Sequence, residues 1–237
     1  HYPLRRQRQM CIRDSSYIIV DEKNQIACVI DPSEAQPIIN FVEEKKIYLK
    51  YILNTHHHYD HIGGNEELKK KYNSKIVGFK EDRNRIPGIN EFVENNQIWK
   101  ADNFEAKIFH VPGHTSGHIA YHFYKEKKIF TGDTLFSLGC GRIFEGTYEE
   151  MFNSLNKIKN LSEDTKIYCG HEYTLQNSKF CIYHDSKNLN LKKKIIEIEE
   201  KVRKGLPTIP SILKDEIKCN IFPVSYTHLT LPTKRIV

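Results

Sequence analysis

Short apolar runs, each closed by glycine, proline or charged residues, recur through the first 170 residues of the chain. Runs of this length, rich in β-branched and aromatic side chains, predict strands. They cover residues 16–20, 26–30, 47–54, 75–79, 104–111, 119–124, 128–131 and 166–169. The first two runs, and again 119–124 with 128–131, are close enough along the chain to predict hairpins.

Two capping boxes, in which Ser or Thr is followed three residues later by Gln or Glu, predict helix starts. They are Ser33 with Gln36 and Thr147 with Glu150. We expect the first helix over 34–45 and the second up to residue 160, with a shorter helix at 66–72. The polar stretch 80–96 predicts a surface loop. Strands in two groups with helices between them predict two facing sheets covered by helices.

The pattern changes after Leu175. Residues 187–204 combine lysine and glutamate with regularly spaced apolar positions, which predicts an amphipathic helix that ends at Gly205 and Pro207. We therefore expect one domain over 16–173 and a small helical domain over 174–223.

The two ends differ from the body of the chain. HYPLRRQRQMCIRDS and VSYTHLTLPTKRIV resemble translated sequencing-adapter sequence. We therefore expect a non-native leader at 1–15 and a non-native tail at 224–237, with an Arg-rich transit peptide as the alternative for the leader.

Composition and charge limit the classes of partner. The net charge of +6 is concentrated in the two ends, so no basic face for nucleic acid is expected on the body. No run of 18 apolar residues is present, so no membrane span is expected. Six cysteines without a CxxC pair, and no apolar signal-peptide core, predict free thiols in the cytoplasm.

The densest group of chemically active side chains follows the third predicted strand. The stretch reads THHHYDHIGGN and carries His56, His58, Asp60 and His61 within six residues. Alternate residues of an extended chain point the same way, so His56 and His58 should lie side by side with His57 turned away. The bend that follows lets Asp60 and His61 face a second point. Imidazole and carboxylate together suit zinc and iron, so a metal site is expected rather than a polar loop with chance histidines.

Three later strands also end in a glycine turn that presents a metal-type residue. These residues are His114, Asp133 and His171. Asp133 stands at a position suited to bridge two metals. Because strand ends on one side of a sandwich meet, all seven candidates should converge on one rim.

The remaining polar candidates are expected to have other roles. His118 should hold its loop or pack, and His110 and His122 should be ordinary sheet residues. Asp31 is either an outer carboxylate beneath the ligands or a simple strand-end turn residue.

Four motifs resemble, in order and spacing, those of the metallo-β-lactamase superfamily: THHHYDHIGGN, VPGHTSGHI, FTGDTLF and CGHEYT. GCGRIFEGT (139–147) and KVRKGLPTIPS (201–211) narrow the resemblance to glyoxalase II, the hydroxyacylglutathione hydrolases. The resemblance implies a four-layer αββα metallo-β-lactamase sandwich as the catalytic domain. It also implies that the small α-helical C-terminal domain binds substrate and is truncated here.

The same resemblance implies two divalent metal ions. One would be held by His56, His58 and His114, and the other by Asp60, His61 and His171. Asp133 would bridge them. Zinc is the expected metal, with iron or manganese as alternatives.

The activity implied is hydrolysis of S-D-lactoylglutathione to D-lactate and glutathione, the second step of methylglyoxal detoxification, by a monomeric cytoplasmic enzyme. A hydroxide bridging the metals would attack the thioester, with Asp60 and Asp133 as the catalytic carboxylates. Glutathione would contact Arg142, Phe144 and Tyr173. Arg142 stands where the family commonly has lysine, and Phe144 where many members have tyrosine.

Three alternatives are weaker. A persulfide dioxygenase with a single iron shares part of GCGR, but Phe144–Thr147 and KVRKGLPTIPS argue against it. A β-lactamase generally has cysteine where this chain has Asp133. A non-catalytic product whose basic ends bind polyanions would show salt-sensitive binding that a chelator does not affect.

Overall fold

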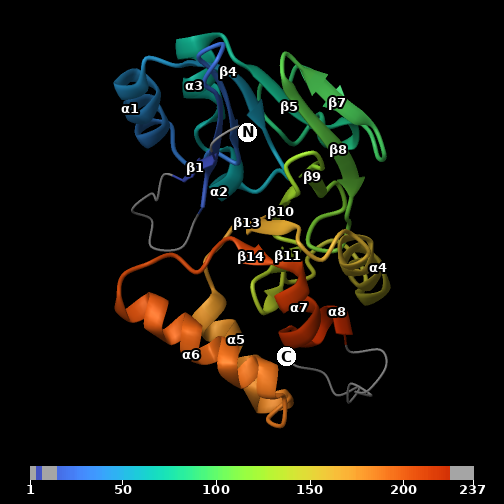
Figure 1. Ribbon diagram of the computed structural model, residues 1–237. Coiled ribbons are helices and arrows are strands. Elements are labelled where there is room, and N and C mark those ends of the chain that lie inside the picture. The colour runs from blue at the N-terminus through green and yellow to red at the C-terminus, as the bar shows by residue number, and fades with distance from the viewer. Residues whose placement is uncertain (1–3, 7–14, 225–237) are drawn as a thin grey trace.

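The computed structural model describes residues 4–6 and 15–224, and two six-stranded sheets form its centre (Figure 1). The first sheet has the order β1-β2-β3-β4-β5-β6. Its strands are β1 (Leu4–Arg6), β2 (Tyr17–Asp21), β3 (Ile26–Ile30), β4 (Tyr48–Leu53), β5 (Lys75–Phe79) and β6 (Glu91–Val93).

The second sheet has the order β14-β13-β10-β9-β8-β7. Its strands are β7 (Ile98–Ala101), β8 (Phe104–His110), β9 (Ile119–Phe123), β10 (Lys128–Gly132), β13 (Lys166–Cys169) and β14 (Ser211–Ile212). A two-stranded ribbon follows β10 and is made of β11 (Leu135–Phe136) and β12 (Gly139–Cys140).

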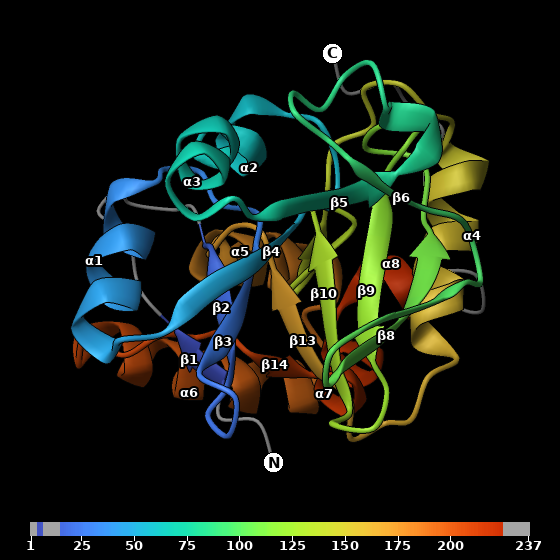
Figure 2. The ribbon, with the colours of Figure 1, turned by 90° about the horizontal axis from the view of Figure 1, so that it is seen from above.

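Helices cover both outer faces and form the C-terminal region. They are α1 (Gln36–Lys45), α2 (Tyr59–Ile62), α3 (Asn65–Tyr72), the 3₁₀ helix η1 (Lys80–Asp82), α4 (Tyr148–Lys159), α5 (Thr174–His184), α6 (Leu189–Arg203), α7 (Leu213–Cys219) and α8 (Ile221–Val224). Seen from above, α1 and α3 lie outside the first sheet and α4 lies outside the second (Figure 2).

Alternation along the strands explains these layers. Tyr17, Leu53, Tyr121 and Phe130 belong to one buried cluster between the two sheets. The neighbouring strand positions face outward, where Ile38 and the rest of α1 pack on the first sheet, and Met151, Leu155 and Ile158 of α4 pack on the second. The expected αββα sandwich followed by a helical C-terminal region is confirmed.

The directions of the strands determine at which sheet edge the candidate ligands can lie close together. In the first sheet β3, β4 and β5 are parallel. In the second, β10 is parallel to β13, and β8 and β10 are both antiparallel to β9 between them. The carboxyl ends of β8, β10 and β13 therefore lie at the same edge of the second sheet.

Several predictions of local structure are corrected. Leu4–Arg6, excluded from the expected fold, pairs antiparallel with β2, whose edge offers unpaired backbone groups. Ser33 does not cap a helix; α1 begins at Gln36 after Ala35, which provides no side-chain cap. The expected loop 80–96 contains η1 and β6. Apart from Ser15, which is buried, the rest of the predicted leader lies outside the described residues, as does the predicted tail after Val224.

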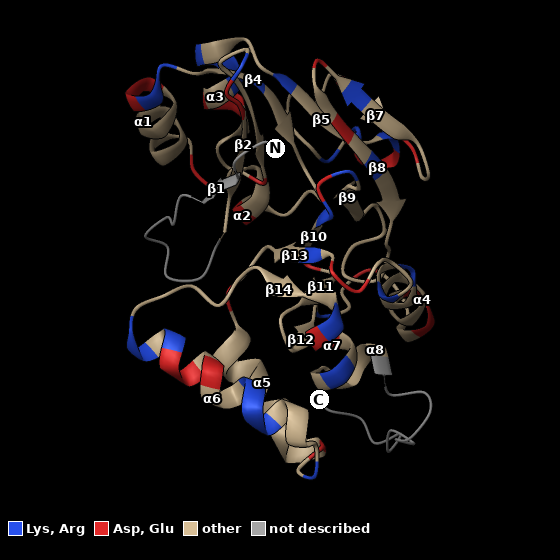
Figure 3. Cartoon of the chain, in the orientation of Figure 1, with Lys and Arg blue, Asp and Glu red and all other residues tan. Residues whose placement is uncertain are grey.

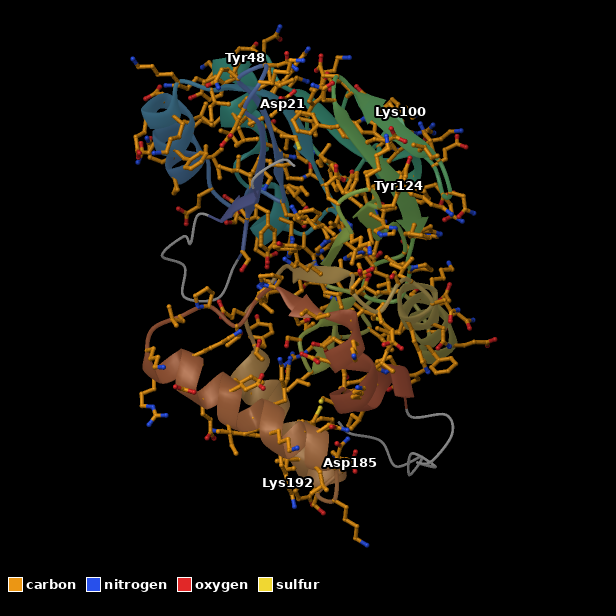
Figure 4. The ribbon with its side chains drawn as sticks, viewed as in Figure 1. Asp21, Tyr48, Lys100, Tyr124, Asp185 and Lys192 are labelled. Atoms are coloured by element: carbon orange, nitrogen blue, oxygen red, sulfur yellow. The ribbon has the colours of Figure 1, made fainter. Side chains whose placement is uncertain are left out.

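The C-terminal helices lie at one end of the molecule and the sandwich lies at the other (Figure 1). Figure 4 labels Tyr48 and Lys100 at one end of the molecule and Asp185 and Lys192 at the other, where α5 turns into α6. Basic and acidic residues interleave along α6 (Figure 3). Among the described residues, no helix has the length and apolar character needed to cross a membrane.

Candidate metal centre

The predicted metal-type residues meet at the rim of the sandwich because each follows a strand that ends there. The turn and short helix after β4 carry His56, His58, Asp60 and His61. The other three candidates follow β8, β10 and β13, and they are His114, Asp133 and His171.

The first group consists of three imidazoles. The ligand-capable atoms of His56, His58 and His114 lie within 4.8 Å of one another. Nδ1 of His58 is 3.0 Å from Nε2 of His114. As alternation predicts, His57 is not part of this group.

The second group combines a carboxylate with two imidazoles. The ligand-capable atoms of Asp60, His61 and His171 also lie within 4.8 Å of one another. Nε2 of His171 is 3.4 Å from Nε2 of His61 and 3.4 Å from Oδ2 of Asp60.

Asp133 lies between the two groups. Its Oδ2 is 3.1 Å from Nε2 of His171 and 3.5 Å from Nε2 of His114. Its Oδ1 is 3.4 Å from Nε2 of His61. One carboxylate therefore contacts members of both groups, which is the position expected of a bridging ligand.

Outer contacts orient three of the imidazoles. Nδ1 of His61 is 3.0 Å from Oδ2 of Asp31, and Nδ1 of His114 is 2.8 Å from the carbonyl oxygen of Arg142. Thr55 donates its hydroxyl to Asp31, so its Oγ1 can accept from Nδ1 of His56 at 3.0 Å. In each neutral ring these bonds place the proton on Nδ1 and leave Nε2 as the acceptor that faces the centre.

Asp31 combines the two roles considered for it. Its carboxylate contacts His61 and also accepts the backbone N–H of Thr55 at 2.8 Å. Its φ of 48° lies in the left-handed region at the end of β3.

Electrostatics favour a cation at this position. Burial and the neighbouring histidines lower the pKa of His56 far below its ordinary value, so its ring is neutral. Burial also lowers the pKa of His61, but the carboxylates of Asp133 and Asp31 outweigh burial and raise it to about 9. The excess negative charge that raises the His61 pKa also attracts a metal ion.

The donor set fits divalent metals. Nε2 of His56 and Oδ1 of Asp133 are buried, and neither makes a hydrogen bond. Buried polar atoms without hydrogen bonds are costly unless another partner satisfies them. Neutral imidazole and ionised carboxylate are ligands that zinc, iron and manganese accept.

The other histidines lie outside both groups. His118 is buried, in keeping with the expectation that it packs, and its Nε2 accepts the backbone N–H of Asp133 at 3.0 Å, so it holds the Asp133 turn rather than its own loop. His110 stacks on Phe79, and His122 lies in β9.

Two of the three predicted substrate contacts lie against the imidazoles. The ring of Phe144, which is 63% exposed, lies 5.2 Å from that of His114. The ring of Tyr173 stacks on His171 at 5.1 Å and lines a cavity of about 260 Å³ beside α5 and α6. The side chain of Arg142 is exposed, and its backbone carbonyl holds His114.

The sequence did not identify the groups that contact His57. Its ring nitrogens face Asp82 and Glu145, and Arg85 contacts both carboxylates. The only local sign was the three-residue spacing of Asp82 and Arg85, which is common in polar loops.

Two family models match the chain. Residues 13–96 and 100–171 match the metallo-beta-lactamase superfamily, and residues 172–224 match the hydroxyacylglutathione hydrolase C-terminus. A hydroxyacylglutathione hydrolase from Pelagibacter ubique is 65% identical over 219 residues, which cover 92% of each chain.

Two solved structures are similar in fold. The B3 metallo-beta-lactamase BLEG-1 has a TM-score of 0.72 at 20% identity and covers 94% of this chain and 100% of its own. ETHE1 from Myxococcus xanthus has a TM-score of 0.65 at 26% identity, over 72% of this chain and 76% of its own.

Proposed function

This chain belongs to the metallo-beta-lactamase superfamily and, within it, to the hydroxyacylglutathione hydrolases; from that premise we propose that it hydrolyses S-D-lactoylglutathione to D-lactate and glutathione. The observation that carries the proposal is the contact of Asp133 with imidazoles of both candidate ligand groups at the sandwich rim. The C-terminal region that contributes α5 and α6 beside this rim matches the hydrolase family model.

The residues that would hold metal are those of the two groups. His56, His58 and His114 would hold one divalent ion, and Asp60, His61 and His171 the other, with Asp133 shared between them. Zinc is the ion we propose, since imidazole nitrogen and carboxylate oxygen are its usual ligands. When bound, such a pair of ions supplies an acidified water and polarises a carbonyl oxygen.

The chain's own groups account for the remaining demands of the reaction. Asp60, with its side chain 45% exposed beside His171, can accept a hydrogen bond from the attacking water and orient it. The departing thiol of glutathione has an ordinary pKa of about 8.5, so it can leave as thiolate without a general acid. Scission of the C–S bond then releases D-lactate and glutathione.

Substrate contacts are proposed at the same rim. The exposed ring of Phe144 would provide an apolar wall beside His58 and His114. Arg142 would supply a cation for a glutathione carboxylate, and its planar guanidinium can hold both oxygens. Tyr173 would contact the peptide from the side of the cavity it lines.

Hydrolysis of S-D-lactoylglutathione by the purified chain tests the proposal, with metal content measured on the same sample. We expect turnover with about two metal ions per chain, as for two-metal hydrolytic sites. Asp133→Ala and His58→Ala should abolish turnover and lose metal. His184→Ala, which removes an exposed imidazole from the end of α5, should change neither.

Other outcomes would point elsewhere. Two metals without turnover would retain the metal site and contradict this substrate. A single iron with oxygen uptake on glutathione persulfide would favour the persulfide dioxygenase.

We also propose that the chain acts as a monomer in the cytoplasm. Within the described part of the chain, all five cysteines are free thiols, which is usual in a reducing compartment. Light scattering of the purified chain checks the oligomeric state.

A further inference from the structure

A network of polar and charged side chains joins four loops beside the candidate metal centre. Its members lie on the metal loop, the turn after β5, the loop after β8, and the segment before α4. They are His57, Asp82, Arg85, Ser116 and Glu145.

The ring of His57 lies between two carboxylates. Its Nδ1 is 3.6 Å from Oδ2 of Asp82, and its Nε2 is 3.5 Å from Oε1 of Glu145. His57, whose neighbours on both sides are candidate ligands, therefore lies against carboxylates from two other loops.

Arg85 connects the same two carboxylates. Its Nε donates to Oδ1 of Asp82 at 3.0 Å, and its Nη1 donates to Oε2 of Glu145 at 2.7 Å. Glu145 also accepts the backbone N–H of Ser116 at 2.8 Å and the Ser116 hydroxyl at 2.9 Å. One guanidinium thus links the turn after β5 to the segment before α4.

Asp82 places a fully buried carboxylate in this network. A Cβ on Gly117 would lie 1.9 Å from its Oδ1, so the carboxylate packs directly on the backbone of the His114–His118 loop. Burying a charge is costly even when it is paired. The packing of an ordinary surface loop does not require a buried carboxylate of this kind.

Glu145 lies in the segment that presents the proposed substrate contacts. Phe144 donates its backbone N–H to the carbonyl of His114 at 3.2 Å, and Gly146 donates to that of Gly113 at 3.2 Å. Between these two bonds, the Glu145 side chain turns back to Arg85, Ser116 and His57. The orientation of Phe144, and of Arg142 two residues before it, therefore depends on where Glu145 is anchored.

We propose that Asp82, Arg85 and Glu145 form a positioning network that fixes the Arg142–Phe144 segment relative to the metal loop and so sets the affinity for the glutathione thioester. This inference rests on the proposed function. The network residues act through Phe144, Arg142 and His57, so the network acts on substrate binding more than on the chemical step.

A double-variant cycle tests the network. Glu145→Gln and Arg85→Gln should each raise KM for S-D-lactoylglutathione about tenfold, because each leaves a charged partner without its counter-ion. The double variant should also show a rise of about tenfold, since both changes break one unit. The kcat and the metal content per chain should stay close to those of the unmodified chain.

Glu149→Gln is the matched control, because it removes the same charge from an exposed position in the first turn of α4. Its KM should be unchanged. Arg85→Lys keeps the charge without the planar fork and should recover part of the loss. Thermal unfolding of every variant separates folding defects from binding defects.

Four results would overturn the inference. They are an unchanged KM in both single variants, a hundredfold rise in the double variant, no recovery with Arg85→Lys, and a fall of kcat and metal content together with the rise in KM. A calorimetric Kd for glutathione is measured in parallel. If the unmodified chain binds glutathione without hydrolysing the thioester, only the proposed function fails, and the variants are then compared by their Kd for glutathione. If the chain neither binds glutathione nor hydrolyses the thioester, the proposed function and the positioning network both fail.

Discussion

The backbone at Gly170 lies directly against two of the candidate ligands, the shared carboxylate Asp133 and His61 of the second group. A Cβ there would lie 2.4 Å from Oδ1 of Asp133 and 2.6 Å from Cε1 of His61. Gly170→Ala should therefore displace the shared carboxylate Asp133 and one ligand of the second group, His61. We expect a loss of bound metal and a fall in thioester hydrolysis of about a hundredfold or more, as misplacement by an ångström can cause. Elemental analysis and steady-state kinetics on one sample measure both.

Gly205→Ala separates this effect from a general loss of stability. Gly205 has a φ of 65°, but a Cβ there would meet no atom within 4 Å. The variant should lose about 1 kcal/mol of stability from the left-handed backbone, and it should keep its metal. Full metal content in Gly170→Ala would contradict the geometry of the centre.

His122 makes stability depend on pH. Burial, with Lys107 nearby, lowers the pKa of His122 to about 4. In the unfolded chain the pKa is about 6.5, so between these values the unfolded state binds more protons. The contribution of His122 is fully present above pH 6.5 and is lost as the pH falls toward 4.

His122→Gln should flatten the dependence of unfolding free energy on pH between 7.5 and about 5, because glutamine has no proton to bind in this range. Urea unfolding at a series of pH values measures the slope. His184→Gln, at an exposed position, is the control. Equal slopes for His122→Gln and the unmodified chain would contradict this account.

The predicted ligands could be found from the sequence because each follows an apolar run and a turn, a relation between near neighbours. The network around His57 could not. Asp82 and Glu145 are 25 and 88 positions away from His57 along the chain. No local spacing relates residues that only the packing of two sheets brings together.

Among the elements, α4 has the most complete start. Thr147 accepts the backbone N–H of Glu150 at 3.1 Å, and Glu150 accepts that of Thr147 at 2.7 Å. Thr147→Ala should lower the free energy of unfolding by about 1 kcal/mol, the usual cost of losing such a cap. Denaturant unfolding measures the change, and an unaltered midpoint would show that the cap contributes nothing.

The capping-box prediction was wrong for α1, because Ser33 and the residues after it make other contacts. The backbone N–H of Ser33 donates to the hydroxyl of Ser16, which holds the chain against β2. Pro37 then stands in the first turn of α1, where its missing N–H does no harm. The strands β6 and β7 were missed because they are short and partly exposed, so their alternation is weak.

At the scale of the whole molecule, the candidate metal centre joins the two sheets. The ligands after β4 come from the first sheet, whereas His114, Asp133 and His171 come from the second. Metal bound here should therefore stabilise the entire sandwich. At a free metal concentration 100 to 1,000 times Kd, the expected gain is about 3–4 kcal/mol.

Removal of metal by a chelator should accordingly lower Tm by several degrees, and addition of zinc should restore it. Calorimetry before and after treatment measures the shift. The Asp133→Ala variant should respond less to both treatments. An identical Tm with and without chelator, in a sample shown to lose its metal, would contradict this role.

The layered architecture was predictable because strand and helix patterns alternate in the order a sandwich requires. Pairing at the sheet edges was not, because it depends on segments far apart along the chain. Tyr17 to Asp21 reads as a strand by itself, but its pairing with Leu4–Arg6 does not follow from its pattern. Ser211–Ile212 likewise reads as a connection between helices.

The pairing of β14 with β13 sets the order in which the molecule can be completed during synthesis. Lys166 and Ile167 pair with Ile212 and Ser211, so the second sheet keeps an open edge until the ribosome has released the C-terminal region. An interrupted chain that ends before Ser211 would expose the backbone of β13 beside a formed metal loop. Such an edge is a template for pairing with another chain. Premature termination in this region therefore carries a risk of aggregation.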